Sequence, residues 1–146
     1  MILPLGVPES VVVTGAERTT IWPTVQAAAK KNQLEIEADQ RAHLGIFYRS
    51  DHFSMAQSGV PAFSVSVGMK IKGKPKDFAR KAMQEFNDKA YHSPQDELKP
   101  EWDFSGFVVL ARFALDVARD VANADRLPTW NLGDEFRPAR EGSQVK

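Results

Sequence analysis

Cysteine is absent from this 146-residue chain, which excludes disulfide bonds, cysteine-ligated zinc and thiol nucleophiles together. No apolar run is long enough to cross a bilayer, and the N-terminus lacks the charged-then-apolar pattern of a secretion signal. Neither sign of charge is in excess, because 19 Lys and Arg residues balance 19 Asp and Glu residues. We therefore expect no membrane segment and no attraction to nucleic acid, and any bound metal needs His, Asp or Glu ligands.

The length and composition are those of one globular domain, with 42% hydrophobic and 26% charged residues. Strand-like and helix-like patterns alternate along the chain, which predicts an α/β fold with helices on both faces of a sheet. The expected strands are 9–14, 34–36 and 61–67, and the expected helices are 17–31, 50–57 with Ser50 as N-cap, 77–90, and 103 or 105 to about 123. Residues 41–48 are expected to form a loop, with a strand at 44–47 as the alternative. We expect residues 1–126 to form the domain and 127–146 to form a tail punctuated by Pro and Gly.

The most informative segment is the loop expected after the helix at 77–90, which contains His92, one of only three histidines. Tyr91 precedes it, and a Ser-Pro turn that would fix the direction of the imidazole follows. A neutral imidazole on such a loop is a common ligand for a catalytic metal, and the phenol of Tyr91 could donate to an oxyanion beside that metal. Asp96 either holds the imidazole tautomer or caps the turn. The alternative for His92 is a solvated surface histidine.

A second segment of interest lies at 49–52, where an arginine precedes an acidic residue and a histidine. Arg49 is placed to receive a carboxylate through two parallel hydrogen bonds, or it is simply a surface arginine. Adjacent residues rarely bind one ion together, so Asp51 and His52 are expected to brace the turn rather than to bind metal. No motif surrounds His43, which is expected to be solvated.

These two segments together carry a resemblance to a known family. The residues Tyr48-Arg49-Ser50-Asp51-His52-Phe53-Ser54-Met55 with Gly59-Val60-Pro61, and later Tyr91-His92-Ser93-Pro94-Gln95-Asp96, resemble the M28 family of zinc aminopeptidases. The resemblance extends from residue 1 to about residue 123. It implies that the chain is the C-terminal portion of an α/β/α sandwich with a mixed, mostly parallel sheet flanked by helices.

The resemblance also implies a role for each matched residue. His92 would be a zinc ligand, and Tyr91 would stabilise the tetrahedral oxyanion. Arg49 would bind or orient the peptide substrate, and Ser66 lies on the strand that would line the pocket for the substrate's first side chain. Asp51, His52 and Asp96 would brace the site. Arg49, Tyr91 and His92 are then expected to converge around one cleft.

The family binds two zinc ions through a His, a bridging Asp, a Glu and a further Asp, and it uses a catalytic Glu, all upstream of the matched region. The last Asp commonly stands in an Asp-Met-Ile context, and this chain begins Met1-Ile2-Leu3. The expectation is therefore a fragment of a zinc aminopeptidase that is inactive by itself and binds little or no zinc. Two alternatives stay open: a glutaminyl cyclase-like transferase, which Tyr91 in place of Trp disfavours, and a non-enzymatic binding or structural module.

Two further expectations concern the surroundings of the molecule. Half of a sandwich leaves an unpaired strand edge, so we expect a homodimer that uses Ile2, Leu3, Leu5 and Val11–Val13, unless the tail with Trp130 and Phe136 covers the gap. The resemblance to the M28 family, and no residue pattern of this chain, suggests a secreted or periplasmic bacterial protein.

Overall fold

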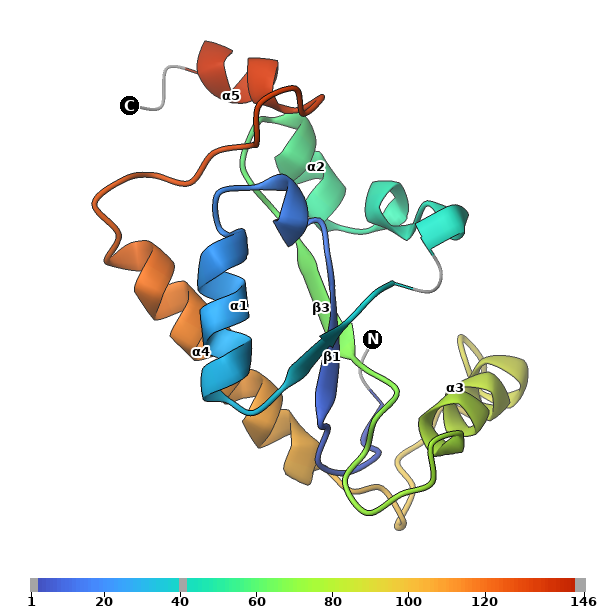
Figure 1. Cartoon of the computed structure of the whole chain (residues 1–146). Coiled ribbons are helices and arrows are strands. Elements are labelled where there is room, and N and C mark those ends of the chain that lie inside the picture. The colour runs from blue at the N-terminus through green and yellow to red at the C-terminus, as the bar shows by residue number, and fades with distance from the viewer. Residues whose placement is uncertain (1–2, 40–41, 144–146) are drawn as a thin grey trace.

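The computed structural model describes residues 3–39 and 42–143, which form a small sheet between two layers of helices (Figure 1). Its strands are β1 (Ser10–Thr14), β2 (Glu35–Glu37) and β3 (Ser64–Val67). Its α-helices are α1 (Trp22–Lys31), α2 (His52–Gln57), α3 (Phe78–Lys89), α4 (Ser105–Ala122) and α5 (Arg137–Gly142). Three short 3-10 helices are η1 (Ala16–Arg18), η2 (Ala42–Leu44) and η3 (Ile46–Arg49). The expected α/β fold is confirmed.

The sheet is mixed, and its strand order is β2-β1-β3. β1 pairs with β2 in parallel, joined through α1, and with β3 antiparallel, where Val11 lies opposite Val67. β1 is consequently the central strand, and its residues cannot serve as an exposed edge. The expected dimer edge at Val11–Val13 is therefore wrong, because both sides of that segment are already hydrogen-bonded. Ile2 lies outside the described residues.

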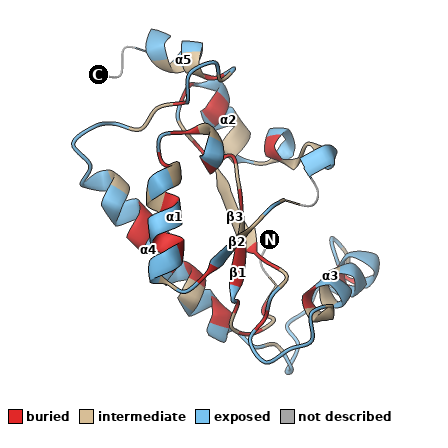
Figure 2. Cartoon of the chain, viewed as in Figure 1, coloured by how far each residue is buried: buried red, intermediate tan, exposed pale blue. Residues whose placement is uncertain are grey.

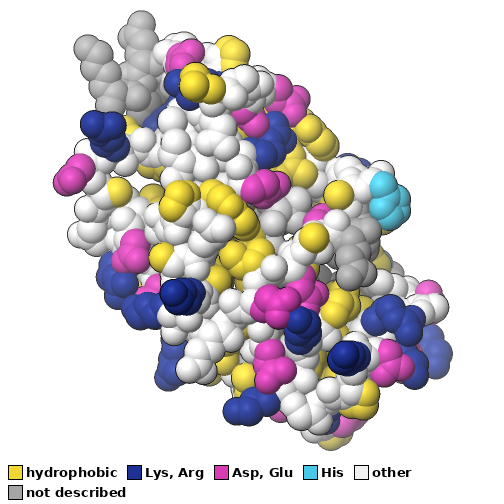
Figure 3. Space-filling model, in the orientation of Figure 1, with side chains coloured by type: hydrophobic (Ala, Val, Ile, Leu, Met, Phe, Trp, Pro, Cys, Tyr) yellow, Lys and Arg dark blue, Asp and Glu magenta, His cyan; other side chains and the backbone are white. Residues whose placement is uncertain are grey.

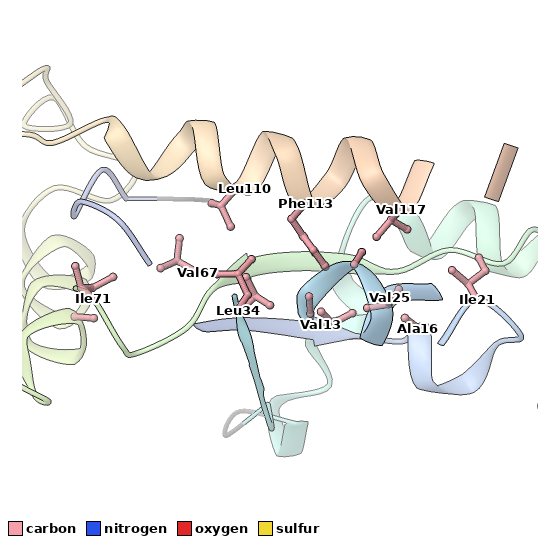
Figure 4. Close-up of a cluster of buried hydrophobic side chains, with 14 residues drawn as sticks. Val13, Ala16, Ile21, Val25, Leu34, Val67, Ile71, Leu110, Phe113 and Val117 are labelled. Carbon is pink, nitrogen blue, oxygen red and sulfur yellow. The ribbon is translucent and has the colours of Figure 1, made fainter. Parts of the chain in front are cut away.

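The main core lies between the sheet and the layer formed by α1 and α4, while α3 lies on the other side of the sheet (Figure 1). Alternate residues of a strand face opposite sides, so Val11 and Val13 point into this core. They meet Val25 of α1 and Phe113 of α4, both of them fully buried (Figure 4). The apolar periodicity of α1 predicted its buried face correctly, since Ile21, Val25 and Ala28 are all buried. For α4 the expected apolar face was Phe107, Leu110, Ala111, Ala114 and Val117, and only Leu110 and Val117 of these are buried, while the fully buried Phe113 was missed.

An ion pair between the buried Asp116 of α4 and the exposed Lys31 fastens α4 to the end of α1. Asp116 is 8% exposed, and it accepts hydrogen bonds from Lys31 Nζ at 2.6 Å and Asn32 Nδ2 at 2.8 Å. These two hydrogen bonds, first that of Lys31, lower the pKa of Asp116. The carboxylate is therefore fully paired where the two helices meet.

Two local expectations and one alternative were wrong. Residues 44–47 form parts of two 3-10 helices rather than a strand, because Gly45 between them adopts a left-handed φ of 60°. Ser50 does not cap α2, since its hydroxyl donates back to the carbonyl oxygen of Ile46 at 2.7 Å. The helix expected from Glu17 begins only at Trp22, because the Thr19 hydroxyl accepts the N–H of Ile21 and ends the preceding turn.

Residues 127–143 of the expected tail pack on the rest of the chain. Trp130 is fully buried, and it forms a second hydrophobic cluster with Phe47, Ala56 and Phe136. The indole N–H of Trp130 donates to the carbonyl oxygen of Gly59 at 3.0 Å. Within the described ranges, no helix has the length and apolar character needed to span a membrane.

Candidate functional site

The loop after α3 holds Tyr91 and His92 in contact with each other. α3 ends at Lys89, and the N–H groups of Ala90 and Tyr91 both donate to the carbonyl oxygen of Phe86, at 2.8 and 2.9 Å, which closes the end of the helix. His92 then turns the chain with a positive φ of 55°, an uncommon conformation for a residue other than glycine. The ring centroids of Tyr91 and His92 lie 3.9 Å apart. Both side chains are exposed, and His92 makes no hydrogen bond or ion pair with a described residue.

The turn that follows His92 is fixed by local hydrogen bonds. Ser93 donates through both its N–H and its hydroxyl to the carbonyl oxygen of Ala90, at 3.0 and 2.7 Å. The N–H of Asp96 donates to the carbonyl oxygen of Ser93 at 3.1 Å. The turn therefore holds the backbone on which His92 stands. The Asp96 side chain is exposed, and its expected bracing role stays a prediction.

Arg49 and the residues after it form a separate segment at η3 and α2. Arg49 is exposed and has no hydrogen bond or ion pair to any residue that the structure describes. Asp51 occupies the N-cap position of α2 without a side-chain capping bond. His52 packs edge-on against Phe47, with ring centroids 4.7 Å apart. Its Nε2 atom is buried without a hydrogen-bond partner in the described structure, and burial lowers its pKa against the opposing effect of Asp51.

Ser66 lies on β3 opposite Val12, on the sheet face that turns away from the main core. It is half-buried and lines a cavity of about 290 Å³ between the sheet and α3. Arg80 and Met83 of α3 form the far wall of this cavity. Ser66 therefore lines a hollow between the sheet and α3, and its expected role in a substrate pocket stays a prediction.

The structure brings some of the expected site residues together and leaves others apart. Tyr91, His92 and Asp96 share one loop, and Asp51 and His52 share the start of α2. Arg49, Tyr91 and His92 line neither of the two cavities described in this section. In Figure 1 the end of α3 and the segment before α2 are separated. Their convergence around one cleft stays a prediction.

Sequence reasoning missed a larger cavity of about 500 Å³. It lies at the carboxyl ends of the parallel strands β1 and β2, where α/β sheets commonly bind ligands. Gly15, with φ 101°, turns the chain at its floor, and Tyr48 lies at its wall. On the face of the molecule drawn in Figure 3, hydrophobic side chains lie across the middle, with charged side chains around them. The sequence feature that could have indicated this cavity is Gly15, which directly follows the first expected strand.

Arg18 connects this cavity to the C-terminal segment. Its guanidinium donates to Asp134 at 2.7 Å and to Glu135 at 2.9 Å, and it lies 4.9 Å from the ring centroid of Phe47. Burial opposes the charged form, but the two carboxylates outweigh it and raise the pKa of Arg18. The phenol of Tyr48 donates to the same Glu135 at 2.7 Å, which raises the pKa of Tyr48. This network fixes the residue that directly precedes Arg49.

The described residues do not supply a complete metal site. Nowhere in the described ranges do three His, Asp or Glu side chains gather closely enough to hold an ion. Structural and catalytic zinc sites use three or four protein ligands. His92 can therefore be at most one ligand of a site whose other ligands lie outside these residues.

Comparison with known proteins assigns the chain at the level of family. The family model described as "Peptidase family M28" matches residues 1–116. That range includes the Arg49 segment, the strand with Ser66 and the His92 loop. A search of curated proteins and a search of solved structures gave no significant match.

Proposed function

The chain belongs to peptidase family M28, and on that premise we propose that it is part of a zinc-dependent aminopeptidase domain in which His92 binds metal. The observation that carries this proposal is the state of His92. Its imidazole is exposed, lies against the phenol of Tyr91 and has no hydrogen-bond partner among the described residues. An imidazole held by a fixed turn with both ring nitrogens unengaged is suited to metal binding.

The rest of the zinc site is assigned to residues outside the described part of this chain. One histidine does not hold zinc at useful affinity, and the described residues do not fit a complete site. We infer that the other ligands and the catalytic Glu belong to the remainder of a longer domain, of which this chain is the C-terminal part. By itself the chain is then expected to be inactive.

Within that domain, this chain supplies hydrogen-bond donors and a substrate wall. Tyr91 is 46% exposed, and its hydroxyl has no partner in the described structure, so it is free to donate to an oxyanion. Arg49 presents an exposed guanidinium that can receive the carboxylate of a peptide. Ser66 contributes to the pocket wall. Asp51, His52 and Asp96 keep their expected supporting roles.

The first test uses the chain of 146 residues. Aminoacyl chromogenic substrates are assayed with and without added zinc, and zinc binding is measured by calorimetry. We expect no turnover and no tight stoichiometric zinc. Turnover that a chelator abolishes would overturn the assignment of ligands to residues outside the chain.

The second test uses the complete peptidase domain that contains this chain. His92→Gln should remove bound zinc and turnover, while His43→Gln, a change at another exposed histidine, should leave both unchanged. Tyr91→Phe should lower kcat with zinc content intact, because it removes only the donor. Retained zinc and turnover in His92→Gln would overturn the proposal. Cyclisation of N-terminal glutamine would instead support the transferase alternative, and a domain without any turnover would support the binding module.

A further inference from the structure

Helix α4 has apolar residues on two opposite faces, and only one of these faces is covered. Its inner face buries Leu110, Phe113 and Val117 against α1 and the sheet. On the opposite face, exposed apolar residues form a continuous line, which we call the outer stripe: Phe104, Val108, Ala111, Leu115, Ala118 and Ala122. Figure 2 shows both buried and exposed residues along α4. Helices that are apolar all round are normally buried on all sides.

The outer stripe has the spacing of a helix-pairing seam. Its residues follow one another at alternating intervals of four and three, as in the apolar positions of a coiled coil. The large side chains are substantially open, with Phe104 44%, Val108 55% and Leu115 66% exposed. The stripe starts at Phe104, the N-cap residue of α4, and ends at Ala122, the last of the helix's 18 residues, a length of about 27 Å at about 1.5 Å per residue.

The order of large and small residues along the outer stripe fits a second copy of the same helix. We propose that two copies of this chain associate by packing their α4 helices antiparallel about a two-fold axis at the middle of the stripe. In that arrangement every layer pairs a large side chain with an alanine: Phe104 with Ala122, Val108 with Ala118, and Leu115 with Ala111 of the other copy.

This size complementarity is what selects the antiparallel pair. A parallel pair would set like against like, so that two Phe104 side chains would crowd one layer while alanines left gaps in others. The neighbouring Ala114 is exposed as well and lets the two helices approach closely. The proposal goes beyond the proposed function and does not rest on it.

The charges beside the outer stripe make the association depend on salt. Arg112 is exposed next to the middle of the stripe, so it would lie near its counterpart in the other copy. The two positive charges of these Arg112 side chains would repel each other, and added salt would screen that repulsion. Dimerisation should therefore strengthen as the salt concentration rises, and Arg112→Ala should weaken that salt dependence.

Sedimentation velocity of the full chain over a wide concentration series tests the proposal. We expect a monomer–dimer equilibrium that Leu115→Glu weakens at least about ten-fold, because a charge would be buried in an apolar layer. Leu132→Glu is the matched control, since Leu132 is 87% exposed and lies outside α4. It should leave the equilibrium unchanged. Circular dichroism of each variant checks that the fold is retained.

An exchange of layer partners tests the antiparallel register itself. Ala111→Leu should weaken the dimer, because it places two leucines in one layer. Adding Leu115→Ala restores one large and one small residue per layer, so the double variant should recover the affinity. A double variant no tighter than Ala111→Leu would overturn the register.

Two other results would overturn the proposal as a whole. One is a monomer at every concentration and salt level. The other is a dimer that Leu115→Glu leaves intact, which would place the contact elsewhere. A monomeric chain that binds the remaining part of a peptidase domain, with binding lost in Leu115→Glu, would assign the outer stripe to that segment instead of to a second copy.

Discussion

The two hydrophobic clusters of this chain are built in different ways. The larger one, between the sheet and the layer of α1 and α4, consists mainly of aliphatic side chains on regular strands and helices. The smaller one consists of Phe47, Ala56, Trp130 and Phe136, contributed by short helices and by the tail. Periodic burial holds the first cluster together. The second depends on a few polar contacts between residues that are far apart in the sequence.

Arg18 shows how the smaller cluster is held. It is 23% exposed, and it pairs with Asp134, whose side chain is only 8% exposed. Its guanidinium also lies 4.9 Å from the ring of Phe136. In the larger cluster each apolar side chain is surrounded by several others, and the Asp116–Lys31 pair lies beside the cluster, not at its centre. A destabilising substitution in the larger cluster should therefore unfold the whole chain. A substitution in the smaller cluster should release only the tail.

The largest expected effect is in the main core. Phe113→Ala removes a fully buried ring from the centre of α4 and should lower the free energy of unfolding by about 4 kcal/mol. Urea denaturation followed by circular dichroism measures the change. Phe107→Ala on the same helix is the control, because Phe107 is 39% exposed and should cost less than about 1 kcal/mol. Equal losses in the two variants would show that this core is not what stabilises the fold.

The next effect is in the smaller cluster. Arg18→Met keeps the apolar stem but leaves Asp134 unpaired, and it should cost about 2 kcal/mol. Hydrogen exchange should become faster in the tail around Trp130 while the amides of β1 stay protected. Lys89→Met, which breaks an exposed pair with Glu85, should change neither quantity measurably. Uniformly faster exchange in Arg18→Met would show that the two clusters unfold as one unit.

The same division explains what the sequence could predict. The bounds of helices α3 and α4 and of strand β1 were expected within a residue or two, because their apolar periods are regular. The apolar residues of α4 lie on two faces, so its period alone did not show which face is buried. Residues 44–47 read equally well as a strand, and only the left-handed turn at Gly45 makes them 3-10 helices. The Arg18–Asp134 pair joins residues more than a hundred positions apart, and no local pattern predicts it.

The candidate site divides in a similar way. The loop of Tyr91 and His92 was evident from its motif, and the structure places both side chains in contact. The cavity at the carboxyl ends of β1 and β2 was not evident, because its walls come from several separate segments. Tyr48 links the motif to the cavity. It is the first residue of the matched segment 48–55, it lines the cavity, and its phenol donates to Glu135.

The smallest effect concerns the dependence of the smaller cluster on pH. Burial lowers the pKa of His52 below its ordinary value of 6.5, and the nearby Asp51 opposes that shift. The folded chain therefore prefers the neutral imidazole, whose Nε2 has no partner in the described structure. As the pH falls through 6.5 toward the lower folded pKa, the unfolded chain binds more protons than the folded one. Stability should accordingly fall over that window and then level off with respect to this group.

Replacing the histidine removes this contribution while leaving the other titrating groups in place. The free energy of unfolding of the wild type and of His52→Gln is measured at about pH 7.5 and about pH 5.5. The wild type should lose more stability than the variant between these values, whereas His43→Gln should behave as the wild type because His43 is exposed. Identical pH slopes in His52→Gln and the wild type would mean that His52 gains a partner when protonated. In that case the start of α2, together with the segment that carries Arg49, would change conformation when His52 is protonated.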